Sequence, residues 1–250
     1  MPRLPATELI NRIEDGEIVI ADGAMGTELI RRGALPSETL NCNRTHPDWV
    51  KAIHHEYIEA GARLLYSNTF APPKNRDEYA DVLAGWQILC EECKDTKDKV
   101  WAALSLYPTT VCEHPELMDE LLQAANAPDL VVIETCCSLA EAKIAIQEVR
   151  KRSAALIFAT ATASNRIQME DGTSLNQWFV SCEANRELVG YGDNCDSLWD
   201  YTSGKGQKPR LIKPNAGMPD KDGLYSEVSI EDWTVLVKTL LVGHLLCSPK

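Results

Sequence analysis

The sequence predicts a parallel α/β fold, and within that class a single-domain (β/α)8 TIM barrel over residues 1–250, shortened at its carboxyl end. Short, nearly continuous apolar segments recur along the chain and alternate with segments of helical periodicity. Continuous apolar character is typical of strands that are buried on both faces of a parallel sheet. Eight such units in a chain of 250 residues favour a closed barrel over an open doubly wound sheet, which is the structural alternative.

The expected elements follow one another in a regular order. Eight strands are expected at 17–22, 63–68, 100–106, 129–135, 154–162, 187–194, 210–215 and 240–246. Helices are expected at 46–62, 115–126, 138–152 and 229–241. Gly61 can end the first of these helices, Pro115 can open the second, and Ser229 can cap the last. The polar stretch 200–209 is expected to be a surface loop.

The composition excludes several classes of function. The formal net charge of −12 disfavours nucleic acid and anionic membranes as partners. No apolar run is long enough to span a bilayer, and the first residues lack the apolar core of a signal peptide. We therefore expect a cytoplasmic protein whose nine cysteines are mostly reduced thiols.

Polar residues gather at the predicted strand ends, where a barrel places its chemistry. Asp22 and Gly23 follow the first strand, Asn68 and Thr69 end the second, and Glu134 ends the fourth. The sixth strand ends in Asn194 and Cys195, and the seventh in Asn215. A carboxylate, a thiol and several amides that converge in this way can hold an amino acid.

Five stretches at these strand ends carry a family resemblance. They read DGAMGTELIRRG, SNTF, IET, GDNC and KPNAGMP, in that order. These stretches, taken in this order, resemble those of the homocysteine S-methyltransferases. That family includes the homocysteine-binding module of cobalamin-dependent methionine synthase and the methyltransferases that use betaine or S-methylmethionine. The resemblance covers about residues 17–243.

The resemblance implies a barrel fold and a zinc ion held by three cysteines, with the homocysteine sulfur in the fourth position. Zinc would stabilise the thiolate, which is the nucleophilic form of the sulfur. Cys195 matches the first zinc ligand, and Glu134 matches the residue that holds the amino group of homocysteine. The other residues that match the substrate pocket are Asp22, Gly23, Asn68, Thr69 and Asn215.

The carboxyl end departs from the family pattern. The resemblance implies that the other two zinc cysteines lie in a Gly-Gly-Cys-Cys motif at the end of the eighth strand. That motif is absent here, and the chain ends LVGHLLCSPK without the expected final helix. One alignment leaves no cysteine there; the other makes Cys247 the second zinc ligand, with His244 as a possible third. A barrel that lacks this helix exposes an apolar flank, which a partner chain, such as a second copy in a homo-oligomer, could cover. The alternatives are that the sequence is a fragment or that its reading frame is altered at this end.

The expected activity is zinc-dependent methyl transfer to the thiol of homocysteine, or to a related thiol or selenol, giving methionine. The methyl donor is open, and a corrinoid donor would have to come from a separate protein. The alternatives are a barrel that binds an amino acid or a partner without zinc, and a barrel enzyme that uses Asp22 and Glu134 without metal.

Two cysteine pairs have less specific spacing. Cys136 and Cys137 are adjacent at a strand end, so their side chains should point in opposite directions and only one could reach the site. Cys90 and Cys93 form a C-x-x-C without a second pair, which favours packing over metal or redox chemistry.

Overall fold

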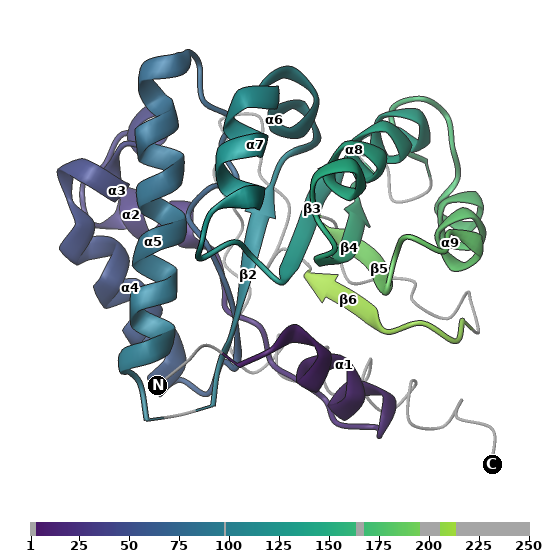
Figure 1. Ribbon diagram of the computed structural model, residues 1–250, viewed down its shortest axis with the longest axis horizontal. Helices are drawn as coiled ribbons and strands as arrows, with labels where there is room; N and C mark the ends of the chain where they lie inside the picture. The colour runs from purple at the N-terminus through teal and green to yellow at the C-terminus, as the bar shows by residue number, and fades with distance from the viewer. Residues whose placement is uncertain (1–3, 98, 164–167, 196–205, 214–250) are drawn as a thin grey trace.

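The computed structural model describes residues 4–97, 99–163, 168–195 and 206–213 (Figure 1). The first part of the chain is helical. It contains α1 (Ala6–Glu14), α2 (Met25–Arg31), the 3₁₀ turn η1 (Pro36–Glu38), α3 (Cys42–Thr45) and α4 (Pro47–Glu59). Helix α4 lies within the expected helix at 46–62, and Gly61 follows it with a positive φ of 103°, as expected of a helix stop.

The strands form a curled parallel sheet of six strands, which confirms the predicted α/β class. They are β1 (Leu64–Tyr66), β2 (Trp101–Leu106), β3 (Leu130–Cys136), β4 (Leu156–Ala161), β5 (Gly190–Asn194) and β6 (Arg210–Lys213). Each strand pairs with the next one along the chain, and Figure 1 shows the sheet curving as half of a barrel. This sequential order is the one that a (β/α) barrel requires.

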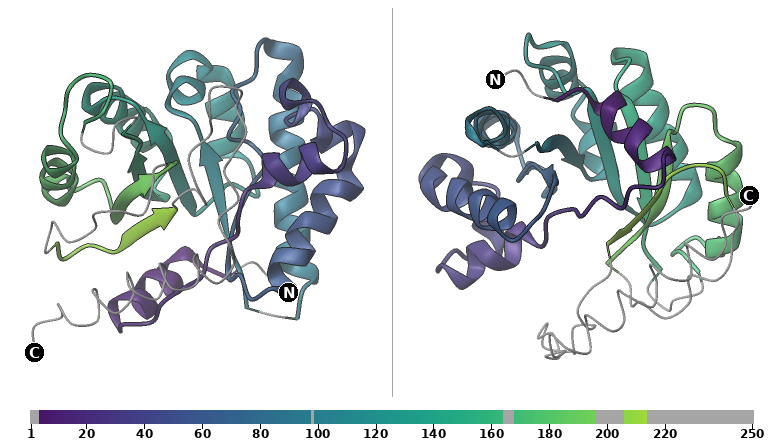
Figure 2. Two further views of the ribbon diagram at one scale, coloured as in Figure 1. Left: turned by 180° about the vertical axis from the view of Figure 1, so that it is seen from behind. Right: turned by 90° about the horizontal axis from the view of Figure 1, so that it is seen from below.

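Helices connect the strands and cover the outer face of the sheet (Figures 1 and 2). They are η2 (Arg76–Glu78), α5 (Tyr79–Asp95), α6 (Pro108–Glu113), α7 (Pro115–Gln123), α8 (Leu139–Arg152) and α9 (Leu175–Ala184). Helix α7 opens on Pro115 as expected, because proline at the first position costs no helical hydrogen bond. Ser138 caps α8 by accepting a hydrogen bond from the backbone of Glu141.

Alternate residues of the strands enter two separate cores. The outer core packs residues such as Leu104, Val131 and Ile157 against the helices. The inner core joins Trp101 and Phe158, which point to the other face, with the first helix. This alternation follows from the two-residue period of a strand. The inner core therefore lies on the concave face of the curled sheet.

Helix α1 lies across the amino-terminal ends of the strands, beneath the inner core (Figure 1). Its Ala6 and Leu9 are buried in that core. The backbone nitrogen of Ala6 donates a 2.7 Å hydrogen bond to Asp129 just before β3, and the Arg12 guanidinium lies 5.1 Å from the centre of the Trp101 ring. Helix α1 therefore covers the end of the curl at which the strands begin.

The expected first strand at 17–22 is reduced to a single β-bridge, between Ala21 and Leu64. The segment still runs parallel to β1, because Leu64 donates to Ile20 and Asp22 donates back to Leu64. Among the described residues this segment has a strand on one side only. The expected helix at 229–241 and strand at 240–246 lie outside the described residues, as does most of the loop at 200–209.

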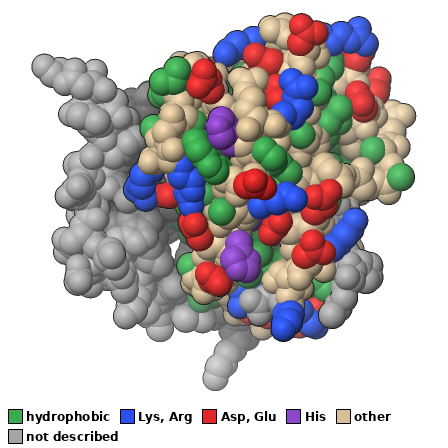
Figure 3. All heavy atoms as spheres, turned by 90° about the vertical axis from the view of Figure 1, so that its left-hand side faces the viewer, with side chains coloured by type: hydrophobic (Ala, Val, Ile, Leu, Met, Phe, Trp, Pro, Cys, Tyr) green, Lys and Arg blue, Asp and Glu red, His purple; other side chains and the backbone are tan. Residues whose placement is uncertain are grey.

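The helical side of the molecule carries acidic and basic side chains that are interspersed (Figure 3). No single-sign patch dominates the face seen there. No helix in the part of the chain that the structure describes is long and apolar enough to cross a membrane. No disulfide bond joins the described cysteines, and both Cys90 and Cys93 lie in the outer core on α5.

Candidate functional site

The side chains that face into the curl are apolar along most of each strand and polar at its carboxyl end. On β3, Leu130 and Val132 precede Glu134, and on β4, Phe158 precedes Thr160. We call six residues the polar rim: Asp22, Ser105, Glu134, Thr160, Asn194 and Lys213. All except Lys213 are buried. The rim is therefore a polar layer above the apolar inner core, at the open end of the curl.

The charged half of the rim is centred on Glu134. Ser105 donates a 2.6 Å hydrogen bond to Oε1 of Glu134, and the Lys213 ammonium donates to Oε2 at 2.9 Å. Strands β3 and β6 are not neighbours in the sheet, so this ion pair must cross the concave interior. The Lys213 nitrogen also lies 3.6 Å from the centre of the Tyr66 ring. A carboxylate and an ammonium thus meet inside the curl, close to an aromatic face.

Asp22 is the second carboxylate of the rim and carries an unsatisfied oxygen. Its Oδ2 accepts a 2.9 Å hydrogen bond from the backbone of Tyr66, whereas Oδ1 is buried without a hydrogen-bond partner among the described residues. Burial raises the pKa of Asp22 to about 7, because the loss of water disfavours the ion. The Lys213 charge partly offsets this rise in pKa. The Tyr66 hydroxyl is also buried and has no hydrogen-bond partner in the part of the chain that the structure describes, and burial holds its pKa well above the usual value.

Gly23 follows Asp22 where the chain passes the ring of Tyr57. A Cβ atom at position 23 would lie 2.7 Å from the Tyr57 hydroxyl oxygen, which is closer than packed atoms approach. Glycine therefore lets the backbone after Asp22 pass next to α4. The structure gives Gly23 a packing reason to be glycine.

The other half of the rim surrounds Cys195. Asn194 accepts hydrogen bonds at Oδ1 from the Thr160 hydroxyl (2.7 Å) and the Thr135 backbone (2.9 Å). Its Nδ2 donates to the Thr135 hydroxyl at 2.7 Å and to the Cys195 sulfur at 3.4 Å. Cys195 itself is exposed. Asn194 therefore ties three strand ends together directly beside an accessible thiol.

The backbone at two of these positions is unusual. Thr135 and Cys195 both have positive φ, at 61° and 56°, a region that residues with a Cβ seldom adopt. Thr135 also lies within the β-bulge of β3, between Ile133 and Cys136. Bulges of this kind redirect side chains near functional sites. Here the irregular backbone turns Thr135 toward Asn194 and Cys195.

The side chains of Asn68 and Thr69 form hydrogen bonds with other residues of the protein. The Asn68 amide donates to the Thr39 carbonyl at 2.8 Å and to the Asn43 side chain at 2.9 Å. The Thr69 hydroxyl donates a 2.6 Å hydrogen bond to the carbonyl of Ser105. These bonds connect the residues that follow β1 to α3, to the segment before α3 and to β2. A direct contact of either side chain with a substrate stays a prediction.

The described residues hold only part of the predicted metal and substrate set. Asn215 and Cys247 lie outside the described residues, as does His244. Within the described ranges, no group of three or more His, Cys, Asp or Glu side chains is arranged to hold a metal ion. Cys136 is buried, whereas Cys137 contacts the Tyr107 hydroxyl at 3.7 Å, so the two thiols have different surroundings. Cys195 is thus the one predicted zinc ligand whose position is described.

Four residues of the site were missed by sequence reasoning: Ser105, Thr160, Lys213 and Tyr66. The first three could have been found by counting in twos along each strand. They are the polar residues that end the inward row in VWAALSL, LIFATA and RLIK. Tyr66 gives no such signal, because its ring belongs to the inner core and only its hydroxyl is unsatisfied.

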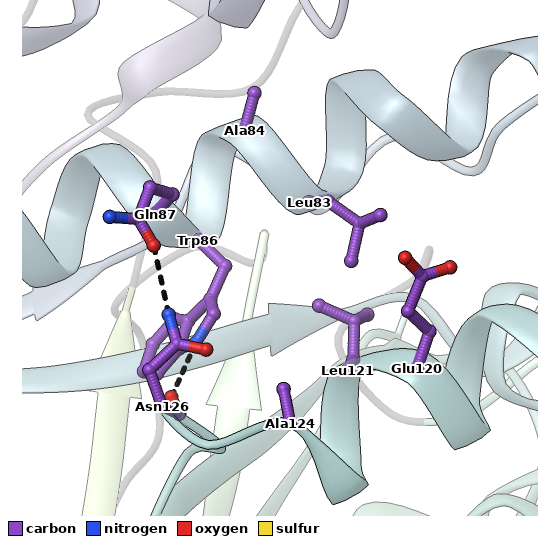
Figure 4. Close-up of a pocket in the computed structure, with 8 residues that line it drawn as sticks. All are labelled: Leu83, Ala84, Trp86, Gln87, Glu120, Leu121, Ala124 and Asn126. Atoms are coloured by element: carbon purple, nitrogen blue, oxygen red, sulfur yellow. Dashed lines mark hydrogen bonds between the residues drawn. The ribbon is translucent and has the colours of Figure 1, made fainter.

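A groove elsewhere on the surface does not belong to this site. It has a volume of about 330 Å³ and lies between α5 and α7, on the outer helical layer. In Figure 4, Leu83 and Leu121 face each other across it, and Asn126 bonds to Gln87 at one end. Its lining is mostly apolar and includes no residue of the polar rim. The strand ends, and not this groove, carry the candidate chemistry.

Comparisons with known proteins agree on one family. The family model described as homocysteine S-methyltransferase matches residues 19–243. The chain is 21% identical to homocysteine S-methyltransferase YbgG of Bacillus subtilis, over 80% of this chain and 78% of that protein. It is 24% identical to the selenocysteine Se-methyltransferase of Brassica oleracea var. italica, over 82% of this chain and 74% of that protein.

A solved structure supports the same fold. The metallated form of the homocysteine methyltransferase MmuM from Escherichia coli superposes with a TM-score of 0.67 at 20% sequence identity. The match covers 83% of this chain and 87% of that chain. At this identity the likeness speaks for the fold, and it agrees with the curled parallel sheet described above.

Proposed function

Because the chain belongs to the homocysteine S-methyltransferase family, we propose that it transfers a methyl group to the sulfur of homocysteine, or of a close thiol or selenol analogue, giving methionine or the corresponding product. The supporting observation is the polar rim. A buried carboxylate, Glu134, and an accessible thiol, Cys195, share one open strand-end site and are linked through Thr135 and Asn194. We also propose that residues 240–246 supply the eighth strand of a complete barrel.

In this proposal Glu134 holds the amino group of the substrate. It is buried and already accepts two hydrogen bonds, so its oxygens are fixed in direction before the substrate arrives. A fixed carboxylate loses little entropy when it binds an ammonium group. The unsatisfied Oδ1 of Asp22 offers a second acceptor nearby. The amino-acid end of the substrate would therefore lie over the acidic part of the rim, with its sulfur directed toward Cys195.

Zinc fits this arrangement in part. Cys195 has the chemistry of a zinc ligand, and Cys247 is the proposed second ligand, with His244 as a candidate third. When bound, zinc would keep the substrate sulfur in its nucleophilic thiolate form at neutral pH. The role of Asn194 and Thr135 would be to orient the Cys195 sulfur, because both lie within hydrogen-bonding reach of it.

The test combines metal content with activity. Purified full-length protein is analysed for zinc and assayed with homocysteine and three donors: S-methylmethionine, betaine and a methylcobalamin-bearing protein. We expect about one zinc per chain, and we expect Cys195→Ser to lower both zinc content and methyl transfer. Cys112→Ser is the matched control, because Cys112 is also exposed but lies on α6. Zinc content that survives in Cys195→Ser removes this residue from the metal site.

A further inference from the structure

The Lys213–Glu134 ion pair is the feature of the rim that methyl transfer does not explain. The ammonium lies 2.9 Å from the carboxylate that is proposed to bind the amino group of the substrate. Among the described residues, Lys213 is the only basic side chain that donates to a member of the polar rim. It projects from the last inward position of β6, opposite Asn194 of β5 in the sheet register.

The charges of the rim would oppose an amino acid if Lys213 were absent. Asp22 and Glu134 are both acidic and buried, and the positive charge of Lys213 lowers the pKa of Asp22 that burial raises. A free amino acid carries a carboxylate next to its ammonium group. The Glu134 carboxylate attracts the ammonium but repels the carboxylate of the substrate, because Coulomb interactions are strong away from water. A substrate with both charges needs a cation beside Glu134.

We propose that Lys213 determines substrate specificity by binding the α-carboxylate of the substrate, while Glu134 binds its α-ammonium group. The ion pair of the unliganded site is exchanged for two new pairs with the zwitterion. Each buried charge then keeps a partner, so the exchange avoids the cost of an unpaired buried ion. The substrate class that follows is a free α-amino acid with a side-chain thiol or selenol. This inference rests on the proposed function.

The position of Lys213 suits this role. Its backbone carbonyl accepts a hydrogen bond from the backbone of Cys195 at 3.2 Å, so the cation and the thiol belong to adjoining strand ends. The Tyr66 ring lies 3.6 Å from the ammonium and, by a cation–π interaction, can hold it when the ammonium group of the substrate takes its place on Glu134. The side chain is about one-fifth exposed, which leaves it accessible from the open end of the curl.

A rival explanation is that Lys213 only neutralises the two carboxylates. The two explanations differ in what they predict for truncated ligands. 3-Aminopropane-1-thiol is homocysteine without its carboxylate, and 4-mercaptobutanoate is homocysteine without its amino group. A carboxylate-binding lysine should favour homocysteine over the aminothiol, because only homocysteine gives the displaced ammonium group of Lys213 a new partner. A purely neutralising lysine should change the binding of homocysteine and the aminothiol by similar factors.

The experiment measures the dissociation constants of homocysteine and of both truncated ligands by titration calorimetry, with zinc in the buffer and no methyl donor. The proteins are the full-length chain, Lys213→Met and, as control, Lys151→Met. Lys151 is also ion-paired, with Glu148, but lies on the outer face of α8. Circular dichroism checks that each variant is folded.

We expect wild type and Lys151→Met to bind homocysteine about 10- to 100-fold more tightly than 3-aminopropane-1-thiol, as one charge-assisted contact provides. In Lys213→Met this preference should fall to about threefold or less. Retention of the full preference in Lys213→Met overturns the inference and leaves the proposed function intact. If Lys213→Met does not fold, the wild-type ratio alone decides: equal binding of homocysteine and the aminothiol overturns the inference. Wild type that binds no homocysteine overturns the proposed function together with it.

Discussion

Replacement of Asp22 by asparagine should make stability less dependent on pH. Burial raises the pKa of Asp22 from 3.8 to about 7. Between these two values the folded protein keeps a proton that the unfolded chain has released. The contribution of Asp22 to stability is therefore greatest below pH 4 and falls as the pH rises toward 7. An asparagine cannot ionise, so Asp22→Asn removes this fall.

The size of the effect follows from the shift. About three pKa units correspond to about 4 kcal/mol in full, of which about 2–3 kcal/mol falls between pH 5 and pH 8. Urea denaturation of wild type and Asp22→Asn at these two pH values measures this contribution of Asp22 to the free energy of unfolding. The free energy of unfolding of the variant should rise relative to wild type by about 2–3 kcal/mol from pH 5 to pH 8.

Contributions of the other titrating groups largely cancel in this comparison of two proteins. Asp48→Asn makes the same exchange at an exposed position in α4 and reports the effect of the substitution on a solvated side chain. A difference between wild type and Asp22→Asn that is the same at both pH values would refute the reasoning. The carboxyl would then not be held protonated by its burial.

Three further substitutions test the framework of the site by urea denaturation. Gly192→Ala should destabilise by about 3 kcal/mol or more, because its Cβ would lie 1.6 Å from the Leu211 carbonyl oxygen; a loss below about 0.5 kcal/mol would contradict this close packing of β5 on β6. Trp178→Phe should cost about 1–3 kcal/mol, since it removes the 2.9 Å hydrogen bond from the indole to the buried Gly192 carbonyl; a neutral result would mean that this bond contributes nothing. Ser138→Ala should cost about 1 kcal/mol and Ser138→Asp much less, because only the alanine removes the cap of α8; equal losses would exclude capping as the cause.

The sequence predicts the outer part of this fold well and the interior of the site less well. Apolar runs located the six described strands, because buried parallel strands need continuous apolar residues. Helix α5 was not predicted, although it is 17 residues long. Its buried positions include Asp81 and Gly85, which hide the apolar period from a sequence reading. The segment at 17–22 was predicted as a full strand, whereas it forms one bridge.

The site shows the same division. Family motifs directed attention to Asp22, Glu134 and Cys195, which the structure places at one open end of the curl. The partner of Glu134 was out of reach for sequence reasoning, because Lys213 is separated from it by 79 positions along the chain. A contact of that kind depends on how far the sheet curls. No local pattern of residues records it.

The closure of the curl by α1 has a consequence for the order of folding. The strands pair in the order in which they are made, so each new strand, with the helix that precedes it, can join the sheet soon after synthesis. Helix α1 is made before all the described strands, yet its anchor on Asp129 is 123 positions away. Closing such a long loop costs chain entropy that only later contacts recover. The apolar face of α1 therefore stays exposed to solvent until β3 has been made.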